Sequence, residues 1–438
     1  MTENFDALVI GAGAGGMAAA GRLQAAGYRT LLVERCDRVG GRASTIEIDG
    51  FRVNTGALVT ETGGENGRLF ADLGVDPGLR EPKRPVVLRL GRRDVPLMSG
   101  PTGKLVQALL AGVGAFSRKT GKRPGRGPTV ADWLDRRKAK PGVRSLARNL
   151  MSALYACEPE DVELALFFDY MTKPGGMSPY AWHPEGSIGP WRVVAADFVT
   201  RGGTLWLSSG VESLTVDGDG RINGARIRRA GSGGDEIVEV GTRLAVSNAG
   251  PLATAAMCPA VALPDGYLER LKAWSQPGAL ITINFASRSR LGPINGLWFF
   301  STTARLAYAA EVTGPCPEMA PPGWHLYAGA CAPKPATGEF DLESELALLR
   351  ADLREHFPGY DSACELSVEV CAGQDWPAQR AIAGKDEPQS TPIANLWNVG
   401  DGARAWTGAG QSGCVESGRL AVEEIRRTIP VSGSAKVS

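Results

Sequence analysis

Two glycine runs in this sequence have the spacing of a loop that binds phosphate groups. Residues 11–16 read GAGAGG and residues 408–413 read GAGQSG, and both satisfy G-x-G-x-x-G. In such a loop, backbone N–H groups at the start of a helix can bind a pyrophosphate. The two runs raise the question of whether the chain binds two dinucleotides or one.

The first run is surrounded by every element that a dinucleotide site requires. The apolar letters DALVIG predict a strand before it, an Ala-rich stretch predicts a helix after it, and YRTLLVE predicts a second strand that ends at Glu34. Gly11 allows the tight turn, Gly13 lets the backbone approach a pyrophosphate, and Gly16 allows close packing of helix and strand. Glu34 can accept hydrogen bonds from an adenosine ribose. These residues fit NAD and FAD equally well.

The residues after Glu34 favour FAD. Five residues separate Glu34 from Gly40-Gly41-Arg42, and two alternating strands joined at Asp49-Gly50 follow as an expected hairpin. This pattern resembles the FAD loop of the flavoprotein superfamily that contains amine oxidases and carotenoid desaturases. The resemblance implies that Arg42 neutralises phosphate and that Gly56 and Ala57 approach the edge of the flavin.

The second glycine run lacks the strand and the acid that would complete a second βαβ unit after Gly413. It resembles instead the C-terminal flavin segment of carotenoid desaturases, with Thr407 and Ser412 at two proline positions of that pattern. The resemblance implies that Asp401 binds a ribityl hydroxyl. It also implies that N–H groups near Gly413 face the N1–C2 edge of the flavin, which becomes negative on reduction. One FAD is predicted to use both runs.

A third segment, residues 202–251, has three strand-like stretches and resembles the part of the family that contacts adenine through Val211 and returns the chain beside the cofactor at Asn248. We predict non-covalent FAD, with Cys414 a free thiol. The predicted cofactor residues are Gly11, Gly13, Ala14, Gly15, Gly16, Glu34, Arg35, Gly41, Arg42, Gly56, Ala57, Val211, Asn248, Gly400, Asp401, Gln411, Ser412, Gly413 and Val415.

The resemblance implies an α/β protein with a Rossmann-type FAD-binding domain, similar to that of glutathione reductase. An α+β substrate domain of mixed sheet and helices would be inserted into it. The chain has 438 residues, enough for two or three domains. We expect residues 1–75, 185–260 and 370–438 to form the FAD-binding domain. Residues 76–184 and 261–369 would form the substrate domain.

Candidate catalytic residues are few. His183 and Trp182 lie in an aromatic, Gly-rich stretch where the family has a segment near the flavin, and Trp406 precedes the second glycine run. His183 is a candidate acid or base, although a structural histidine in a turn is the reading that we favour. Three histidines without ligand spacing and eight cysteines without C-x-x-C predict no metal site.

Two departures from amine oxidases favour the phytoene desaturase-like branch. The stretch ALITINF offers Thr282 where many amine oxidases have a lysine behind the flavin, and the aromatic cage for an amine is missing. The resemblance implies an FAD-dependent oxidoreductase, a desaturase or oxidase that removes hydride from a hydrophobic or aromatic metabolite to flavin N5. A flavin amine oxidase and a redox-neutral FAD-dependent isomerase remain alternatives.

Composition limits the partners. The net charge of +1 gives no reason to expect nucleic acid, so a small-molecule substrate, with O2 or a quinone as electron acceptor, is expected. The N-terminus has no signal-peptide pattern and the cysteines are scattered, which predicts a cytoplasmic protein. The apolar stretch KLVQALLAGVGAF, followed by basic residues, could contact a membrane surface, but a buried helix before a solvated loop is the favoured reading.

Overall fold

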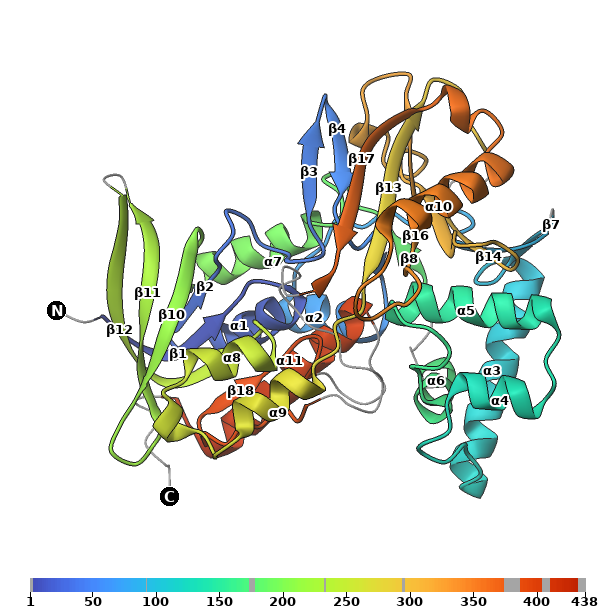
Figure 1. Cartoon of the computed structure of the whole chain (residues 1–438). Helices are drawn as coiled ribbons and strands as arrows, with labels where there is room; N and C mark the ends of the chain where they lie inside the picture. Colours follow the sequence, from blue (N-terminus) through green and yellow to red (C-terminus); the bar gives the residue numbers. More distant parts are fainter. Residues whose placement is uncertain are drawn as a thin grey trace.

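Two seven-stranded sheets form the frame of the molecule (Figure 1). The computed structural model describes residues 3–91, 93–172, 178–231, 234–293, 296–373, 387–403 and 410–431. The first sheet has the order β10-β11-β12-β1-β2-β9, with β18 also paired to β12. Its strands are β1 (Glu3–Ile10), β2 (Thr30–Val33), β9 (Thr204–Trp206), β10 (Ser209–Val216), β11 (Ile222–Gly231), β12 (Gly234–Ser247) and β18 (Leu396–Asn398).

The central strand β1 is buried on both faces. Ala7 and Val9 pack in one core with helices α1 (Ala14–Ala25), α2 (Gly64–Leu73), α7 (Gly189–Thr200) and α11 (Gly410–Thr428). Leu8 and Ile10 pack on the other side, with residues of β10 and β11. Because successive side chains of a strand point to opposite faces, two covered faces require the continuous apolar run ALVI.

The parallel pairings of β1 with β2 and β12 bring several chain segments to one sheet edge. Strand β18 also runs parallel to β12, so β1, β12 and β18 all end near the same place. Glycine loops, Asn248 and Asp401 follow these strand ends. Open α/β sheets commonly bind ligands outside the carboxyl ends of their parallel strands.

The second sheet has the order β17-β13-β16-β15-β14-β6-β7. Its strands are β6 (Val86–Leu90), β7 (Arg93–Pro96), β13 (Leu280–Ser287), β14 (Leu297–Phe300), β15 (Tyr308–Glu311), β16 (His325–Cys331) and β17 (Cys364–Cys371). Helix α10 (Leu342–His356) packs on one face. The hairpin of β3 (Thr45–Ile48) and β4 (Phe51–Asn54), expected at Asp49-Gly50, packs on the other face.

A group of helices lies beside the second sheet (Figure 1). They are α3 (Gly100–Thr120), α4 (Val130–Arg136), α5 (Pro141–Tyr155) and α6 (Leu164–Thr172). The remaining short elements are β5 (Thr60–Glu61), β8 (Tyr180–Ala181), α8 (Pro251–Met257) and α9 (Tyr267–Trp274). Within the described ranges, no helix is both long enough and apolar enough to cross a bilayer.

Helix α3 corrects one prediction. The favoured reading of its apolar stretch was a buried helix, but Leu105, Leu109 and Phe116 are 62%, 60% and 57% exposed. Small residues are the ones that face the protein: Gly103, Gly114 and Ser117 are buried. The mixed α/β class is confirmed, whereas the division into domains at the stated boundaries stays a prediction.

Candidate active site

The first glycine loop joins β1 to α1 and has no room for side chains. Gly11 has φ +88°, a conformation that L-residues with a Cβ rarely adopt. A Cβ at Gly16 would clash with the Gly11 carbonyl oxygen, as the close packing of helix and strand predicts. The loop also contacts the Gly40-Gly41-Arg42 segment, since Gly13 forms a β-bridge with Gly40.

Asn248 fills the space that three glycines leave open. A Cβ at Gly13 would lie 2.7 Å from Asn248 Nδ2, and a Cβ at Gly15 would lie 2.7 Å from Asn248 Oδ1. A Cβ at Gly400 would also clash with the Asn248 amide. The Asn248 backbone N–H donates to the Ile10 carbonyl at 2.7 Å, which fixes its position after β12. Residues far apart in the sequence thus meet at one amide side chain.

Glu34 stands at the end of β2 and is 8% exposed. Its carboxylate accepts hydrogen bonds from the Ala12 N–H at 2.7 Å and the Cys36 N–H at 2.9 Å. These bonds hold the glycine loop against β2. Each carboxylate oxygen has a further lone pair, so Glu34 can still accept a bond from a ribose hydroxyl.

Arg42 and Asp401 form an ion pair, although the resemblance implies separate contacts with phosphate and a ribityl hydroxyl. The Cys414 thiol donates to the other Asp401 oxygen at 3.6 Å. Cys414 is a free, buried cysteine. The two segments implied to bind opposite parts of one cofactor are therefore in direct contact.

The start of α11 is anchored through Gln411. Its side chain donates to the Val59 carbonyl at 2.8 Å and accepts from the Trp191 indole N–H at 3.1 Å. Ser412 Oγ accepts from the Glu65 N–H at 3.3 Å. Helix N-termini carry unpaired N–H groups and partial positive charge, which suits a negative ligand edge.

A large cavity of about 870 Å³ connects these segments with the second sheet. Ligand pockets in proteins usually measure about 300–1,000 Å³. The predicted residues that line it are Gly11, Gly13, Ala14, Gly15, Glu34, Arg35, Gly41, Arg42, Gly56, Ala57, Val211, Asn248, Asp401 and Gln411. Gly16, Gly400, Ser412, Gly413 and Val415 lie behind this surface, and Val415 is fully buried in the core.

Neither Trp182 nor His183, the two candidate catalytic residues that the structure describes, lines the cavity. Trp182 is 2% exposed and packs in the core between the hairpin and the second sheet. His183 Nδ1 accepts from the Glu185 N–H at 2.9 Å, and burial lowers the pKa of the imidazole. A Cβ at Gly78 would lie 3.0 Å from its Nε2, so His183 is closely packed in a turn. The catalytic role predicted for both gains no support, and Trp406 lies outside the described residues.

The opposite wall of the cavity could not be predicted from the sequence. It consists mainly of small or apolar residues from α5 and the second sheet: Ser152, Ala153, Leu154, Ala156, Gly278, Leu280, Tyr308, Glu369, Val370, Cys371 and Ala372. Burial raises the pKa of the Cys371 thiol to about 11, which makes it a poor nucleophile. No local motif marks these residues, since only the pairing of distant strands brings them together. Within the described chain, no cluster of potential metal ligands occurs.

The glycine cradle and the elongated wall fit a dinucleotide such as FAD. The model of the family described as flavin-containing amine oxidoreductase matches residues 14–426. A phytoene desaturase (neurosporene-forming) from Rhodobacter capsulatus is 47% identical over 70 residues, 16% of this chain and 13% of that protein. A putative flavin-containing monoamine oxidase from Mycobacterium tuberculosis is 30% identical over 192 residues, 39% and 41% of the two chains.

These alignments span less than half of each curated relative. Among solved structures, an oxidoreductase from Methanosarcina mazei shares the fold at a TM-score of 0.79 and 24% identity, covering 95% of this chain and all of that one. FAD is the cofactor that the family match implies, and non-covalent binding is typical of the family. The chain belongs to the flavin-containing amine oxidoreductase family and is an FAD-dependent oxidoreductase.

Proposed function

We propose that the protein is a desaturase or oxidase that takes hydride from a hydrophobic or aromatic small molecule. The observation that carries this proposal is the composition of the cavity wall formed by α5 and the second sheet. Leu280, Tyr308, Ala153 of α5 and Ala156 directly after α5 make this wall largely apolar. Within the described lining there is no lysine and no histidine. A wall of this kind suits a reaction that needs positioning and exclusion of water more than acid–base groups.

FAD, when bound, supplies the hydride acceptor. The residues of this chain have simpler tasks. Backbone N–H groups of residues 13–16 bind phosphate, with Arg42 adding positive charge, and Glu34 accepts from the ribose. Thr282 on β13 is 1% exposed and pairs across the sheet with Glu369. Thr282 carries no charge, so it leaves this face of β13 neutral where many amine oxidases have a lysine.

We assign the dinucleotide to a Rossmann-type domain formed by residues 1–75, 185–260 and 370–438, with residues 76–184 and 261–369 as the substrate domain. The parallel unit β1–α1–β2 and the close packing at Gly16 support the first part. The second sheet supports the other part, since most of its strands come from the two inserted segments.

An amine oxidase is the second candidate. The alignment with a monoamine oxidase favours it, as does Glu369, a carboxylate in the cavity wall that could pair with a substrate ammonium. A redox-neutral isomerase is a third reading, and in that case no net electron transfer would occur.

The test is an anaerobic screen of the purified yellow protein against polyenes, aromatic alcohols and amines. Bleaching of the flavin absorbance, followed by recovery with O2 or a soluble quinone, is expected for at least one polyene or aromatic compound. Bleaching by amines alone, with an aldehyde as product, would replace the proposal with an amine oxidase. Conversion of a substrate without bleaching would favour the isomerase. Acid precipitation should leave the flavin in the supernatant.

We also propose that α3 contacts an anionic membrane surface. Leu105, Leu109, Val113 and Phe116 are exposed at a spacing that puts them on one face of the helix. Residues 95–131 contain six Lys or Arg, namely Lys104, Arg118, Lys119, Lys122, Arg123 and Arg126, and no Asp or Glu. Apolar residues next to cations suit the boundary between headgroups and acyl chains.

Vesicle flotation tests this contact. Vesicles of phosphatidylcholine with phosphatidylserine should bind the protein, and vesicles of phosphatidylcholine alone should bind it less. The double variant Leu109→Gln/Phe116→Gln should bind less, whereas Val261→Gln should not change binding, since Val261 is 93% exposed on another part of the surface. Equal flotation of all three proteins would exclude α3 as the contact.

A further inference from the structure

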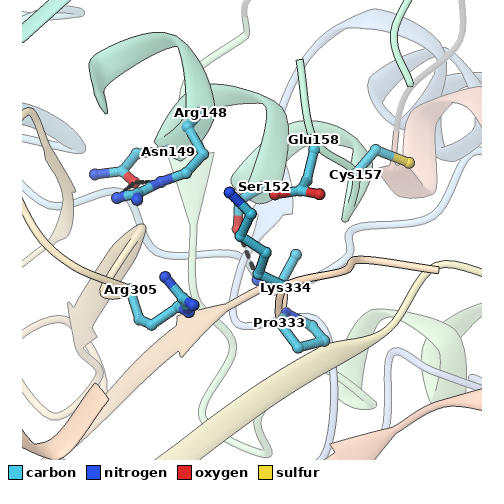
Figure 2. A pocket seen from close by; sticks show the side chains of 9 residues that line it. Arg148, Asn149, Ser152, Cys157, Glu158, Arg305, Pro333 and Lys334 are labelled. Carbon is cyan, nitrogen blue, oxygen red and sulfur yellow. Dashed lines mark hydrogen bonds between the residues drawn. The ribbon is translucent and has the colours of Figure 1, made fainter. Parts of the chain in front are cut away.

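A small basic site adjoins the wall of the large cavity. Figure 2 shows the side chains of Arg148, Ser152, Arg305 and Lys334 around one small space of about 10 Å³. They come from α5, from the segment between β14 and β15, and from the segment after β16. That space has about the volume that one water-sized group requires.

Three parts of the chain that line this site also lie at or next to the wall of the large cavity. Ser152 lines both spaces. Arg305 lies three residues before Tyr308, which lines the large cavity. The segment of Lys334 continues to Ala336, whose carbonyl accepts from the Ala279 N–H at 2.8 Å between the lining residues Gly278 and Leu280. The two spaces therefore adjoin at Ser152.

The positive charges at this site are unequally compensated. Arg305 is held by Glu345 in a two-pronged ion pair. Arg148 instead donates to neutral acceptors, the Asn149 side-chain oxygen and the Thr303 carbonyl. Among the residues that the structure describes, neither Arg148 nor Lys334 forms an ion pair. Burial and the nearby Arg305 charge both lower the pKa of Arg148, while the carboxylates of Asp352 and Glu158 raise it.

The lining is also rich in hydrogen-bond donors. Ser152 Oγ accepts from the Ala332 N–H at 2.7 Å, so its own proton is directed elsewhere. Asn149 is already engaged at both ends of its amide. Glu158 is the carboxylate among the described residues that line this site; burial raises its pKa, and the nearby Lys334 charge lowers it. Hydrogen-bond donors beside an arginine whose own bonds all go to neutral acceptors suit an anionic ligand.

We propose that Arg148, Ser152 and Lys334 bind the carboxylate of an acidic substrate whose carbon skeleton occupies the large cavity. The inference rests on the proposed function, because it assigns a substrate class to the same cavity. One oxygen of the carboxylate enters the small space and accepts from Arg148 and the Ser152 hydroxyl. The exposed Lys334 ammonium neutralises the charge from the solvent side. The apolar wall of Leu280 and Tyr308 covers the carbon chain.

Equilibrium binding to the oxidised, FAD-loaded protein tests the proposal without requiring turnover. The probes are straight-chain monocarboxylates from hexanoate to hexadecanoate, the primary amide of each acid, and acetate, measured by calorimetry. We expect the best acid to bind about 10- to 100-fold more tightly than its amide, as a charge-assisted hydrogen bond of about 1.5–3 kcal/mol predicts. Acetate should bind far more weakly, because the carbon chain contributes through the cavity wall.

Two variants and a matched control locate the contact. Arg148→Gln and Lys334→Gln should each lower the affinity for the acid about tenfold, the fold-change of about 1.4 kcal/mol, and leave that of the amide unchanged. Arg144→Gln on the same helix, where Arg144 pairs with Asp135 at the surface, should change neither. Lys334 is exposed, so its variant is informative even if Arg148→Gln folds poorly.

Equal affinity for acids and amides would overturn the proposal, and so would equal losses in Lys334→Gln and Arg144→Gln. Acetate binding as tightly as the longer acids, with loss in Arg148→Gln, would reassign the site to a free small anion and also overturn it. These outcomes differ from failure of the proposed function, which appears as flavin that no substrate reduces.

Discussion

The two ends of the large cavity are built by different means. At the dinucleotide end, the wall is mostly backbone: glycines 11, 13, 15 and 41 let a ligand approach the main chain, and Asn248 fills the space behind them. At the other end, the wall is made of side chains from α5 and the second sheet, among them Ala153, Leu280 and Tyr308. A backbone wall can bind only what fits its fixed shape, whereas a side-chain wall can change its specificity by substitution.

This difference affects how each end tolerates mutation. A Cβ in the glycine cradle meets backbone or the half-buried Asn248 amide. A substitution in the opposite wall meets other side chains and open cavity. The cofactor end should therefore lose its ligand through single small changes, and the substrate end should change affinity gradually.

The largest effect is expected for Gly15→Val. Its Cβ would lie 2.7 Å from Asn248 Oδ1 and 2.8 Å from the Gly400 nitrogen. Overpacking costs up to about 3 kcal/mol, so FAD affinity should fall roughly 100-fold. FAD titration into apoprotein measures this loss. Gly112→Val is the control, because a Cβ at Gly112 meets nothing within 4 Å. Retained FAD in Gly15→Val would mean that the cradle does not bind the cofactor.

The same difference explains what could be predicted from the sequence. Backbone sites depend on glycine spacing and on neighbouring strands, which are local features, so fourteen predicted residues were found in the cavity wall. The helix and strand around GAGAGG, and the hairpin at Asp49-Gly50, were found for the same reason.

The rest depends on contacts between distant segments. No spacing in the sequence reveals that Ser152, Tyr308 and Cys371 share a wall, because strand pairing across 60 residues or more decides it. The exposed stripe of α3 was misread because apolar spacing identifies a helix face and not what covers it. His183 and Trp182 are candidates because they lie in an aromatic, Gly-rich stretch where the family has a segment near the flavin, and their packing has no local signal.

Glu61 lies on β5, next to the start of α11, in the region between the dinucleotide end and the side-chain end of the cavity. Its ionisation can be used to test this region. The Asn66 amide donates to Glu61 at 3.0 Å, and burial raises its pKa to about 7. The Glu61 carboxyl loses its proton near pH 4.5 in the unfolded chain but only near pH 7 in the folded protein. The free energy of unfolding therefore falls as the pH rises from about 4.5 to about 7. Below about pH 4.5 this penalty is absent, and above about pH 7 it is complete.

Urea unfolding of wild type and Glu61→Gln at pH 5 and pH 8 measures this effect. From pH 5 to pH 8, the free energy of unfolding of the variant should rise by about 2–3 kcal/mol relative to that of the wild type, because glutamine cannot ionise. The exposed Glu47→Gln serves as control and should gain nothing. A constant difference between Glu61→Gln and wild type would show that Glu61 ionises normally in the folded protein.

Glu34→Ala tests a side-chain contact at the dinucleotide end, whereas Gly15→Val tests the backbone wall. Loss of a charged acceptor to the ribose should weaken FAD binding by roughly 1–3 kcal/mol. Part of this loss comes from the loop, since Glu34 also holds the Ala12 and Cys36 N–H groups. Glu34→Gln keeps one acceptor oxygen and should lose less. If both variants bind FAD as the wild type does, Glu34 is not the ribose ligand.

The smallest effect on FAD is expected at the other end, for Ala153→Phe. The larger side chain would extend from α5 into the cavity that Ala153 lines, far along the chain from any predicted cofactor residue. Whichever compound bleaches the flavin anaerobically should then need about tenfold more substrate for half-maximal reduction, the fold-change of about 1.4 kcal/mol, while FAD content stays unchanged. Val143→Phe is the matched control, since Val143 is 47% exposed on the same helix. If Ala153→Phe lost FAD in proportion to its loss of reduction, the two walls would not be independent, and the contrast between a fixed backbone end and an adjustable side-chain end would fail.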